Sequence, residues 1–127
     1  MNFDKIKQMV LQDCDIDETE LDRESLKLPQ LHNKYLNIYL DFKLILERKQ
    51  NEFNKLRKVK WEYYTGKLDA EVLSHLGWEP FDLKILKQDI PIYMEGDEDL
   101  IALQEQVRYY KEICSYLDAT VKEITYR

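Results

Sequence analysis

An unbroken seven-residue repeat near the C-terminal end restricts the fold of this chain more than any other feature. Its apolar residues follow one another at alternating steps of three and four, the spacing of a helix face that packs against another helix. The eight positions are Leu100, Leu103, Val107, Tyr110, Cys114, Leu117, Val121 and Ile124. We predict a helix over residues 96–127, capped by Asp97, and assign these eight residues to oligomerisation.

The composition favours helices throughout. The 127 residues include only three glycines and three prolines, well below the average usage of about 7% and 5%. This scarcity argues against β-sandwiches, glycine-rich phosphate loops and disordered linkers. With 44% hydrophobic and 35% charged residues, the chain has enough apolar surface for the modest core of one domain.

A second long helix is predicted in the first half of the chain. Pro29 suits the first turn of a helix, and no further proline or glycine occurs before Gly66. An apolar stripe with steps of four and three marks its packing face, formed by Leu31, Tyr35, Ile38, Phe42 and Ile45. A helix this long needs a partner, which either the C-terminal helix or another subunit supplies.

The remaining segments are shorter. Residues 3–12 form a short helix with Phe3, Ile6 and Val10 on one side, extended by Met9 and Leu11, before the acidic run of residues 13–24. That run either begins a helix at Asp17 or forms an acidic arm. Residues 67–79 carry a short helical pattern that ends at Gly77, and residues 81–87 alternate as a short strand or an extended arm.

Together these elements predict a mainly α fold. It is a long helical hairpin or bundle with a C-terminal heptad-repeat helix and an irregular arm between the long helices. We place all of it in one domain with three segments, residues 1–66, 67–95 and 96–127. No apolar run reaches the roughly 18–20 residues of a membrane span, and no basic leader begins the chain, so we expect a cytosolic protein.

Residues 48–67, the basic segment, differ in charge from the rest of the protein. They hold seven lysines or arginines and two acids, a local charge of +5. Because the whole chain carries −6, the other residues carry −11. Such separation of charge points to a charged partner, and its sign at the basic segment points to a polyanion.

Single-stranded nucleic acid is the polyanion that best matches the basic segment, because it presents phosphates to cations and bases to aromatic rings. The candidate binding residues are Lys55, Arg57, Lys58, Lys60, Lys67, Trp61, Tyr63 and Tyr64. Lys58 and Lys60 point about 200° apart on a regular helix, so one monomer does not aim both at one strand. The alternative is a solvated helix face whose rings pack into the core.

Signs of catalysis are weak. Neither His32 nor His75 has partners at metal-ligand spacing, no nucleotide-binding glycine loop or nucleophile motif occurs, and Cys14 and Cys114 lie too far apart for a metal-binding pair. The acids near Asp97 suit helix capping better than cation binding. We expect a non-enzymatic protein with no metal and no cofactor.

A resemblance to a known family rests on the segment Lys58-Val59-Lys60-Trp61-Glu62-Tyr63-Tyr64-Thr65-Gly66-Lys67. It resembles the Lys-x-Arg-x-Asp-Tyr-Tyr-Ser-Gly-Arg segment of the UvsY family, recombination mediators of T-even-like bacteriophages. The likeness continues along nearly the whole chain, through the acidic start Asp15-Ile16-Asp17, the arm from Leu83-Lys84 to Tyr93 and the acidic Glu98-Asp99.

The resemblance implies a protein of the infected bacterial cytoplasm that binds single-stranded DNA. It would contact the phage single-strand-binding protein and the phage recombinase, and help the second replace the first. The family's two DNA-binding basic residues correspond to Lys58 and Lys60. At the second of these positions, lysine replaces the family's arginine. Family members form ring-like homo-oligomers through C-terminal helices that continue beyond the position of Arg127, so we expect weakened self-association here.

Two functions therefore stand after the sequence alone. The first is a recombination mediator in which several subunits pool their strand contacts. The second is a coiled-coil scaffold or interaction protein that binds no nucleic acid, with the basic segment held against the acidic arm of a neighbouring subunit. DNA binding that weakens steeply with salt separates the first from the second.

Overall fold

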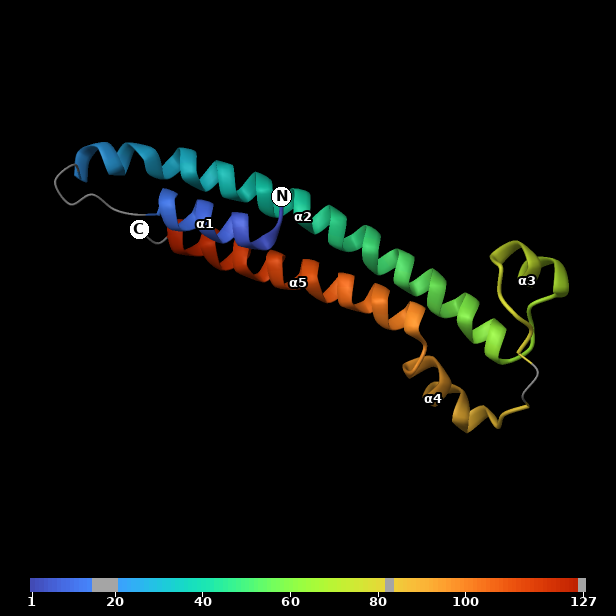
Figure 1. Cartoon of the computed structure of the whole chain (residues 1–127). Coiled ribbons are helices and arrows are strands. Elements are labelled where there is room, and N and C mark those ends of the chain that lie inside the picture. Colours follow the sequence, from blue (N-terminus) through green and yellow to red (C-terminus); the bar gives the residue numbers. More distant parts are fainter. Residues whose placement is uncertain (15–20, 82–83, 126–127) are drawn as a thin grey trace. The chain divides into compact units, whose positions relative to one another are not determined.

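The structure, a computed structural model, describes residues 1–14, 21–81 and 84–125. Its α-helices, labelled in Figure 1, are α1 (Phe3–Asp13), α2 (Leu21–Tyr64), α3 (Ala70–Leu76), α4 (Ile90–Glu95) and α5 (Glu98–Thr125). A short 3-10 helix, η2 (Lys87–Asp89), precedes α4. No strand occurs in these described ranges. The predicted mainly α fold with two long helices is confirmed.

The chain forms two compact units that share the long helices. Unit 1 comprises Met1–Leu46 and Tyr109–Arg127, and unit 2 comprises Glu47–Arg108. The boundaries between the units thus fall inside α2 and α5. Our single-domain organisation in three segments stays a prediction.

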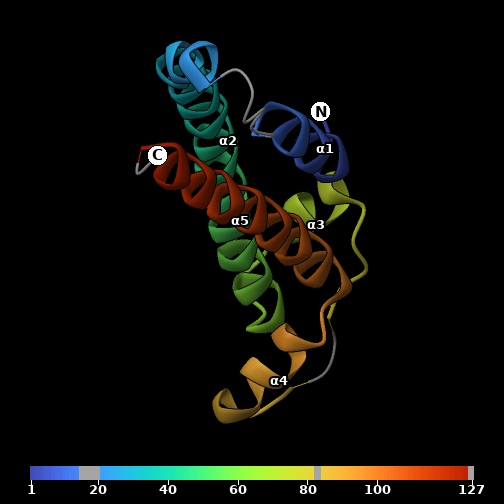
Figure 2. The same cartoon turned by 90° about the vertical axis from the view of Figure 1, so that its left-hand side faces the viewer.

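Unit 1 is a packing of three helices around an apolar core. In Figure 1, α1 runs beside the first part of α2 and the last part of α5, and the turned view of Figure 2 shows that the three do not lie in one plane. Buried side chains from all three helices form the core, namely Ile6, Val10, Tyr35, Phe42, Ile113, Cys114, Leu117 and Ile124. The predicted stripe of α2 and the heptad positions of this part of α5 thus pack within the chain.

Ile113 is fully buried although it lies outside the heptad repeat. In unit 1, α5 packs against both α1 and α2, so it buries a wider face than the two positions per heptad of a two-helix seam. The rings of Phe3 in α1 and Tyr116 in α5 meet edge to face with centroids 5.6 Å apart. Leu11 was assigned to the packing side of α1, but this was wrong, because its side chain is 72% exposed.

The start of α2 differs from the prediction. The helix begins at Leu21, so Pro29 lies inside it instead of at its first turn. An internal proline removes one backbone hydrogen bond and usually kinks or ends a helix. Residues 21–28 nevertheless stay helical, and this stretch is rich in strong helix formers. The alternative helix start at Asp17 lies outside the described residues.

The end of α2 agrees with the prediction. Gly66 follows the helix with a φ of 74°, in the left-handed region that glycine adopts without strain. The backbone N–H of Lys67 donates to the carbonyl of Glu62 at 2.8 Å, and that of Gly66 donates to the carbonyl of Tyr63 at 3.2 Å. These bonds satisfy carbonyls at the helix end.

The connection between the long helices contains more helix than predicted. Asp69 caps α3 by accepting from the backbone N–H of Val72, and Gly77 ends it with a φ of 73°, as the pattern of residues 67–79 indicated. The described part of residues 81–87 forms no strand. Pro91 lies in the first turn of α4, where a missing N–H costs nothing, so it begins a helix that we had not predicted.

None of the helices in the described part of the chain is both long enough and apolar enough to cross a bilayer.

Candidate nucleic-acid interface

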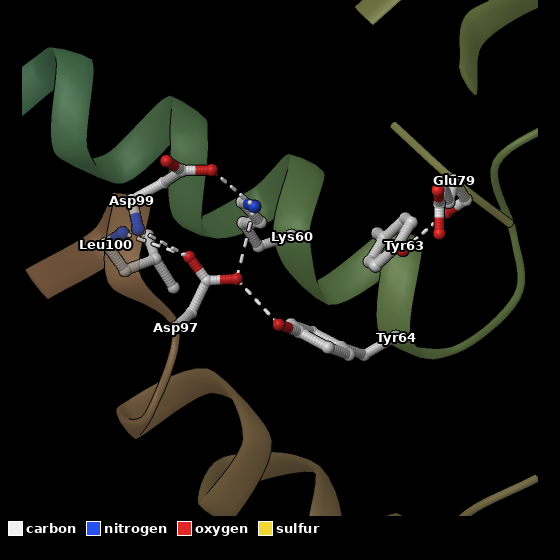
Figure 3. Close-up of polar contacts among 7 residues, drawn as sticks. All are labelled: Lys60, Tyr63, Tyr64, Glu79, Asp97, Asp99 and Leu100. Atoms are coloured by element: carbon white, nitrogen blue, oxygen red, sulfur yellow. Dashed lines mark hydrogen bonds and ion pairs between the residues drawn. The ribbon is translucent and has the colours of Figure 1, made fainter. Parts of the chain in front are cut away.

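Lys60, in the basic segment, has a buried ammonium group. Its side chain lies in unit 2 and the residue is 6% exposed. The Nζ atom is 2.8 Å from Oδ2 of Asp99 and 3.1 Å from Oδ2 of Asp97 (Figure 3). The hydroxyl of Tyr64 donates to the same Asp97 oxygen at 2.6 Å. A cation and a phenol from the end of α2 therefore share one carboxylate before α5.

Asp97 also caps α5 with its other carboxylate oxygen. Oδ1 accepts from the backbone N–H of Asp99 at 3.0 Å and from that of Leu100 at 3.1 Å, which confirms the predicted cap. Aspartate is favoured here because it satisfies unpaired N–H groups at the positive end of a helix. One side chain thus both starts α5 and fastens it to the end of α2.

The electrostatics of this network favour the charged forms of both partners. Burial opposes ionisation of Asp97, but hydrogen bonds from Tyr64, the Leu100 backbone and Lys60 outweigh it and lower the pKa of Asp97. Burial likewise opposes protonation of Lys60, yet its bonds to Asp99 and Asp97 raise the pKa of Lys60. The Lys60 ammonium group therefore compensates part of the negative charge of Asp97 and Asp99.

Tyr63 and Tyr64 belong to an aromatic cluster, defined here as Tyr63, Tyr64, Trp78, Phe81 and Tyr93. Ring centroids lie 5.3 Å apart for Tyr63 and Trp78, 5.0 Å for Tyr64 and Phe81, and 5.7 Å for Phe81 and Tyr93. The Lys60 ammonium lies 4.1 Å from the Trp78 ring centroid. The cluster therefore packs around the Lys60 network, and both tyrosine rings are partly buried in it.

A neighbouring face of the basic segment borders a groove of about 820 Å³ in unit 2. One wall is a single face of α2 with Phe53, Asn54, Arg57, Lys58 and Trp61. The other sides come from η2 and α4 with Lys87, Ile90, Pro91, Met94 and Glu95, and from α5 with Leu100, Ile101 and Gln104. We call this feature the α2–α4 groove.

The structure divides the eight candidate binding residues into three groups. Arg57, Lys58 and Trp61 line the α2–α4 groove, and Lys67 lies over the Trp61 ring, 4.2 Å from its centroid. Lys55 is exposed but does not line the groove. The other three, Lys60, Tyr63 and Tyr64, belong to the network and the aromatic cluster.

The opposed directions of Lys58 and Lys60 follow from helical geometry, as predicted. Lys58 is exposed beside the groove, whereas Lys60 is buried against the start of α5. A spacing of two residues places side chains on different sides of a helix. Direct binding of DNA by these eight residues stays a prediction.

The eight heptad residues divide between the units. Leu100, Leu103 and Val107 lie in unit 2, and the other five lie in unit 1. Cys114, Leu117 and Ile124 belong to the unit 1 core, against which Tyr110 and Val121 pack. Their role in oligomerisation stays a prediction.

Sequence reasoning missed the side of the groove that lies far from the basic segment in the chain. Lys87, Ile90 and Met94 come more than 25 residues after Trp61, and their grouping depends on tertiary packing. A signal was present in Pro91, which begins a helix as readily as it ends an arm. Recognising α4 would have placed Lys87, Ile90 and Met94 near one helical face.

Comparison with known proteins gives a consistent result. The family model "Recombination, repair and ssDNA binding protein UvsY" matches residues 9–127. The recombination protein uvsY of Enterobacteria phage T4 is 20% identical over 127 residues, which cover 100% of this chain and 88% of that protein.

Solved structures of similar fold carry the same family name. Crystal structures of the bacteriophage T4 recombination mediator protein UvsY superpose with TM-scores of 0.86, 0.78 and 0.82 in three lattice types. Their identities are 19%, 18% and 19%, and they cover 98%, 98% and 95% of this chain and 86% of each of theirs. At this level of identity, the likeness establishes a common fold.

Proposed function

The chain belongs to the UvsY family of recombination, repair and single-stranded-DNA-binding proteins, and from this premise we propose that it is a non-enzymatic recombination mediator. It binds single-stranded DNA and helps a phage recombinase replace the single-strand-binding protein that covers the strand. The observation that carries the proposal is the exposed basic face of α2, where Arg57 and Lys58 flank Trp61. Cations for phosphates and a ring for bases are the two requirements of strand binding.

The eight candidate residues then have two kinds of role. Arg57, Lys58 and Lys67 contact phosphates, with Lys55 adding to the local field. Trp61 supplies the ring for a base. Lys60 and Tyr64 support binding indirectly, because they fasten the end of α2 to the start of α5. Tyr63 supports it by fastening the end of α2 to the backbone carbonyl of Glu79. Lys60 is in this respect a positioning residue.

The partners proposed for the protein follow from the same premise. The recombinase and the single-strand-binding protein are two protein partners, and the acidic remainder of the chain supplies a surface of opposite sign to the basic segment. We place the protein in the cytoplasm of an infected bacterium. Both assignments go beyond the family description.

Self-association is part of the proposal because pooled weak sites raise the overall affinity for a long strand. Several of the eight heptad residues are already buried within the chain, so the repeat contributes through its partly exposed members Leu103, Tyr110 and Val121. Leu40 and Leu44 add an exposed apolar stripe on α2, one helical turn apart. These side chains face away from the predicted packing stripe of that helix.

A titration of fluorescein-labelled oligothymidine at two salt concentrations, followed by fluorescence anisotropy, tests strand binding. We expect tight binding at low salt, with a slope of log K against log salt of about −0.7 per phosphate contact. Replacing Arg57 and Lys58 together by alanine lowers the affinity and makes the slope shallower. Lys111→Ala is the matched control, because Lys111 is exposed on α5 in unit 1.

Two outcomes overturn the proposal at different levels. If the wild-type protein does not bind at low salt but still assembles, the scaffold alternative replaces strand binding. If it binds DNA but does not speed recombinase assembly on a strand covered by single-strand-binding protein, measured by energy transfer between labelled strand and recombinase, the mediator role fails and DNA binding stands.

A further inference from the structure

The α2–α4 groove combines a half-exposed indole with cations from two separate helices. Trp61 is 41% exposed and lines the groove from α2. Ile90 and Met94 line it from α4, so apolar side chains share the groove with the indole. The other tryptophan of the chain, Trp78, packs in the aromatic cluster. Only Trp61 therefore presents an indole to the groove.

The charge of the groove is strongly biased. Arg57, Lys58 and Lys87 line it, against the single carboxylate Glu95. Among the described residues, no carboxylate forms an ion pair with any of these three cations. Lys60, by contrast, is fully engaged by Asp97 and Asp99. The three cations of the groove are thus available to an anionic ligand.

The dimensions also fit a small planar ligand. The volume of about 820 Å³ lies within the range of about 300–1,000 Å³ for small-molecule sites. The Lys67 ammonium covers one face of Trp61 at 4.2 Å from the ring centroid, and the ring also borders the groove. Trp61 and the flexible side chain of Met94 both line the groove, and each is a suitable contact for a flat base.

We infer that the α2–α4 groove is a nucleotide subsite for single-stranded DNA, in which a base stacks on Trp61 while Arg57, Lys58 and Lys87 hold the adjoining phosphates. The inference rests on the proposed function and adds a place for the base and a cation outside the basic segment. An acidic segment of a partner protein is the competing occupant. A base makes fuller use of the exposed indole, whereas an acidic chain uses only the cations.

The test follows Trp61 directly. Because the chain has two tryptophans, the Trp78→Phe variant leaves Trp61 as the sole indole and keeps a ring in the aromatic cluster. Titration with unlabelled oligothymidine is expected to quench the fluorescence of Trp61 in parallel with binding. Oligoglutamate at the same charge concentration is expected to leave it unquenched.

Affinity measurements on matched variants complete the test. Trp61→Ala is expected to weaken oligothymidine binding about 5- to 150-fold with an unchanged salt slope, and Trp61→Phe to weaken it less. The control is Ile92→Ala, an exposed residue of α4 that does not line the groove. Circular dichroism verifies that each variant keeps its helices.

The cation of η2 has its own control. Lys87→Ala is expected to reduce the salt slope by about 0.7, the share of one phosphate contact. Lys84→Ala is expected to leave it unchanged, because Lys84 is exposed but does not line the groove.

The outcomes separate the subsite from the function on which it rests. If the wild-type protein fails to bind oligothymidine at low salt, the proposed function itself fails. If it binds, but Trp61→Ala and Lys87→Ala bind as tightly and Trp61 is not quenched, the subsite is overturned and strand binding stands. Quenching by oligoglutamate that equals or exceeds quenching by oligothymidine assigns the groove to an acidic protein segment.

Discussion

The two units of this protein are stabilised by different interactions. Unit 1 has a core of eight buried residues from three helices, six of them apolar side chains, one a tyrosine and one a cysteine. Unit 2 relies more on an ion-paired network and an aromatic cluster. Of the three buried polar residues in the described part of the chain, Lys60 and Asp97 lie in unit 2 and only Thr120 lies in unit 1.

The difference shows that α2 contributes both to the stability of the fold and to the candidate binding groove. In unit 2, Lys60 and Tyr64 face the start of α5, while Arg57, Lys58 and Trp61 face the α2–α4 groove. Two faces of the same helical segment thus carry different tasks. Substitutions in the two units, and on the two faces of α2, should therefore differ in how far they affect stability and how far they affect DNA binding.

The largest effect is expected in the core of unit 1. Leu117 is fully buried, and Leu117→Ala should lower the free energy of unfolding by about 2–5 kcal/mol, because it removes apolar contacts and leaves a cavity. Urea denaturation followed by circular dichroism measures the loss. Leu44→Ala is the control, since Leu44 is 61% exposed, and an equal loss there would refute the assignment of the core.

A slightly smaller effect is expected from the network of unit 2. Lys60→Met should cost about 3 kcal/mol of stability, because it leaves the buried carboxylate of Asp97 without its cation. Lys60→Arg should restore much of the loss by keeping the charge. The same urea titration measures both variants.

DNA binding by the folded Lys60→Met variant sharpens the comparison between the two faces of α2. At a temperature where the variant is folded, its affinity for oligothymidine should fall less than that of the Arg57→Ala and Lys58→Ala double variant. A greater loss of affinity without loss of stability would show that Lys60 contacts the strand directly.

A smaller effect is expected from pH. The pKa of Asp97 is held below its ordinary value of 3.8, so the network stabilises the fold above that pH and the contribution is lost as pH falls through the lowered pKa. The thermal midpoint of the wild-type protein should therefore drop below about pH 4. Asp97→Asn should drop less over the same range, and an equal drop would place the acid sensitivity elsewhere.

Unit 1 also contains a carboxylate with a lowered pKa, that of Asp13. A hydrogen bond from Lys34 lowers the pKa of Asp13, which also accepts from the buried Tyr35 hydroxyl at 2.7 Å. Asp13→Asn should therefore remove another part of the loss in acid. Comparing the two variants divides the pH response between the units.

The smallest effect on stability is expected at the exposed stripe of α2. Leu40 and Leu44 are 46% and 61% exposed, so replacing both by glutamate should change the free energy of unfolding by no more than about 0.5 kcal/mol each. The mass measured by light scattering should fall if this stripe joins subunits. An unchanged mass would indicate that the subunits associate through the heptad repeat instead.

Local patterns in the sequence predicted much of the helical architecture. The heptad repeat, the cap at Asp97 and the glycine ends at Gly66 and Gly77 were predicted from residues close together in the chain, because helix periodicity and capping act over a few positions. The start of α2 was misplaced at Pro29, where helical context overrode a strong local rule. The short helix α4 was missed because its six residues carry little periodicity.

Sequence reasoning identified the α2 side of the candidate site but not the residues that meet it. Charge and aromatic content drew attention to the basic segment, and helical angles separated Lys58 from Lys60. The partners of these side chains, Asp97 and Asp99 for Lys60 and α4 for Trp61, lie some 30 to 40 residues away. No local sequence pattern predicts which of these distant residues will contact Lys60 or Trp61.

The sequence by itself determined both long helices apart from the start of α2, the segregation of positive charge in residues 48–67 and the family to which the chain belongs. The tertiary structure decided which lysine is buried and which faces the groove, and it supplied the second wall with Lys87 and Met94. The reason is physical: helix formation depends on nearby residues, whereas burial and ion pairing depend on which distant segments pack together.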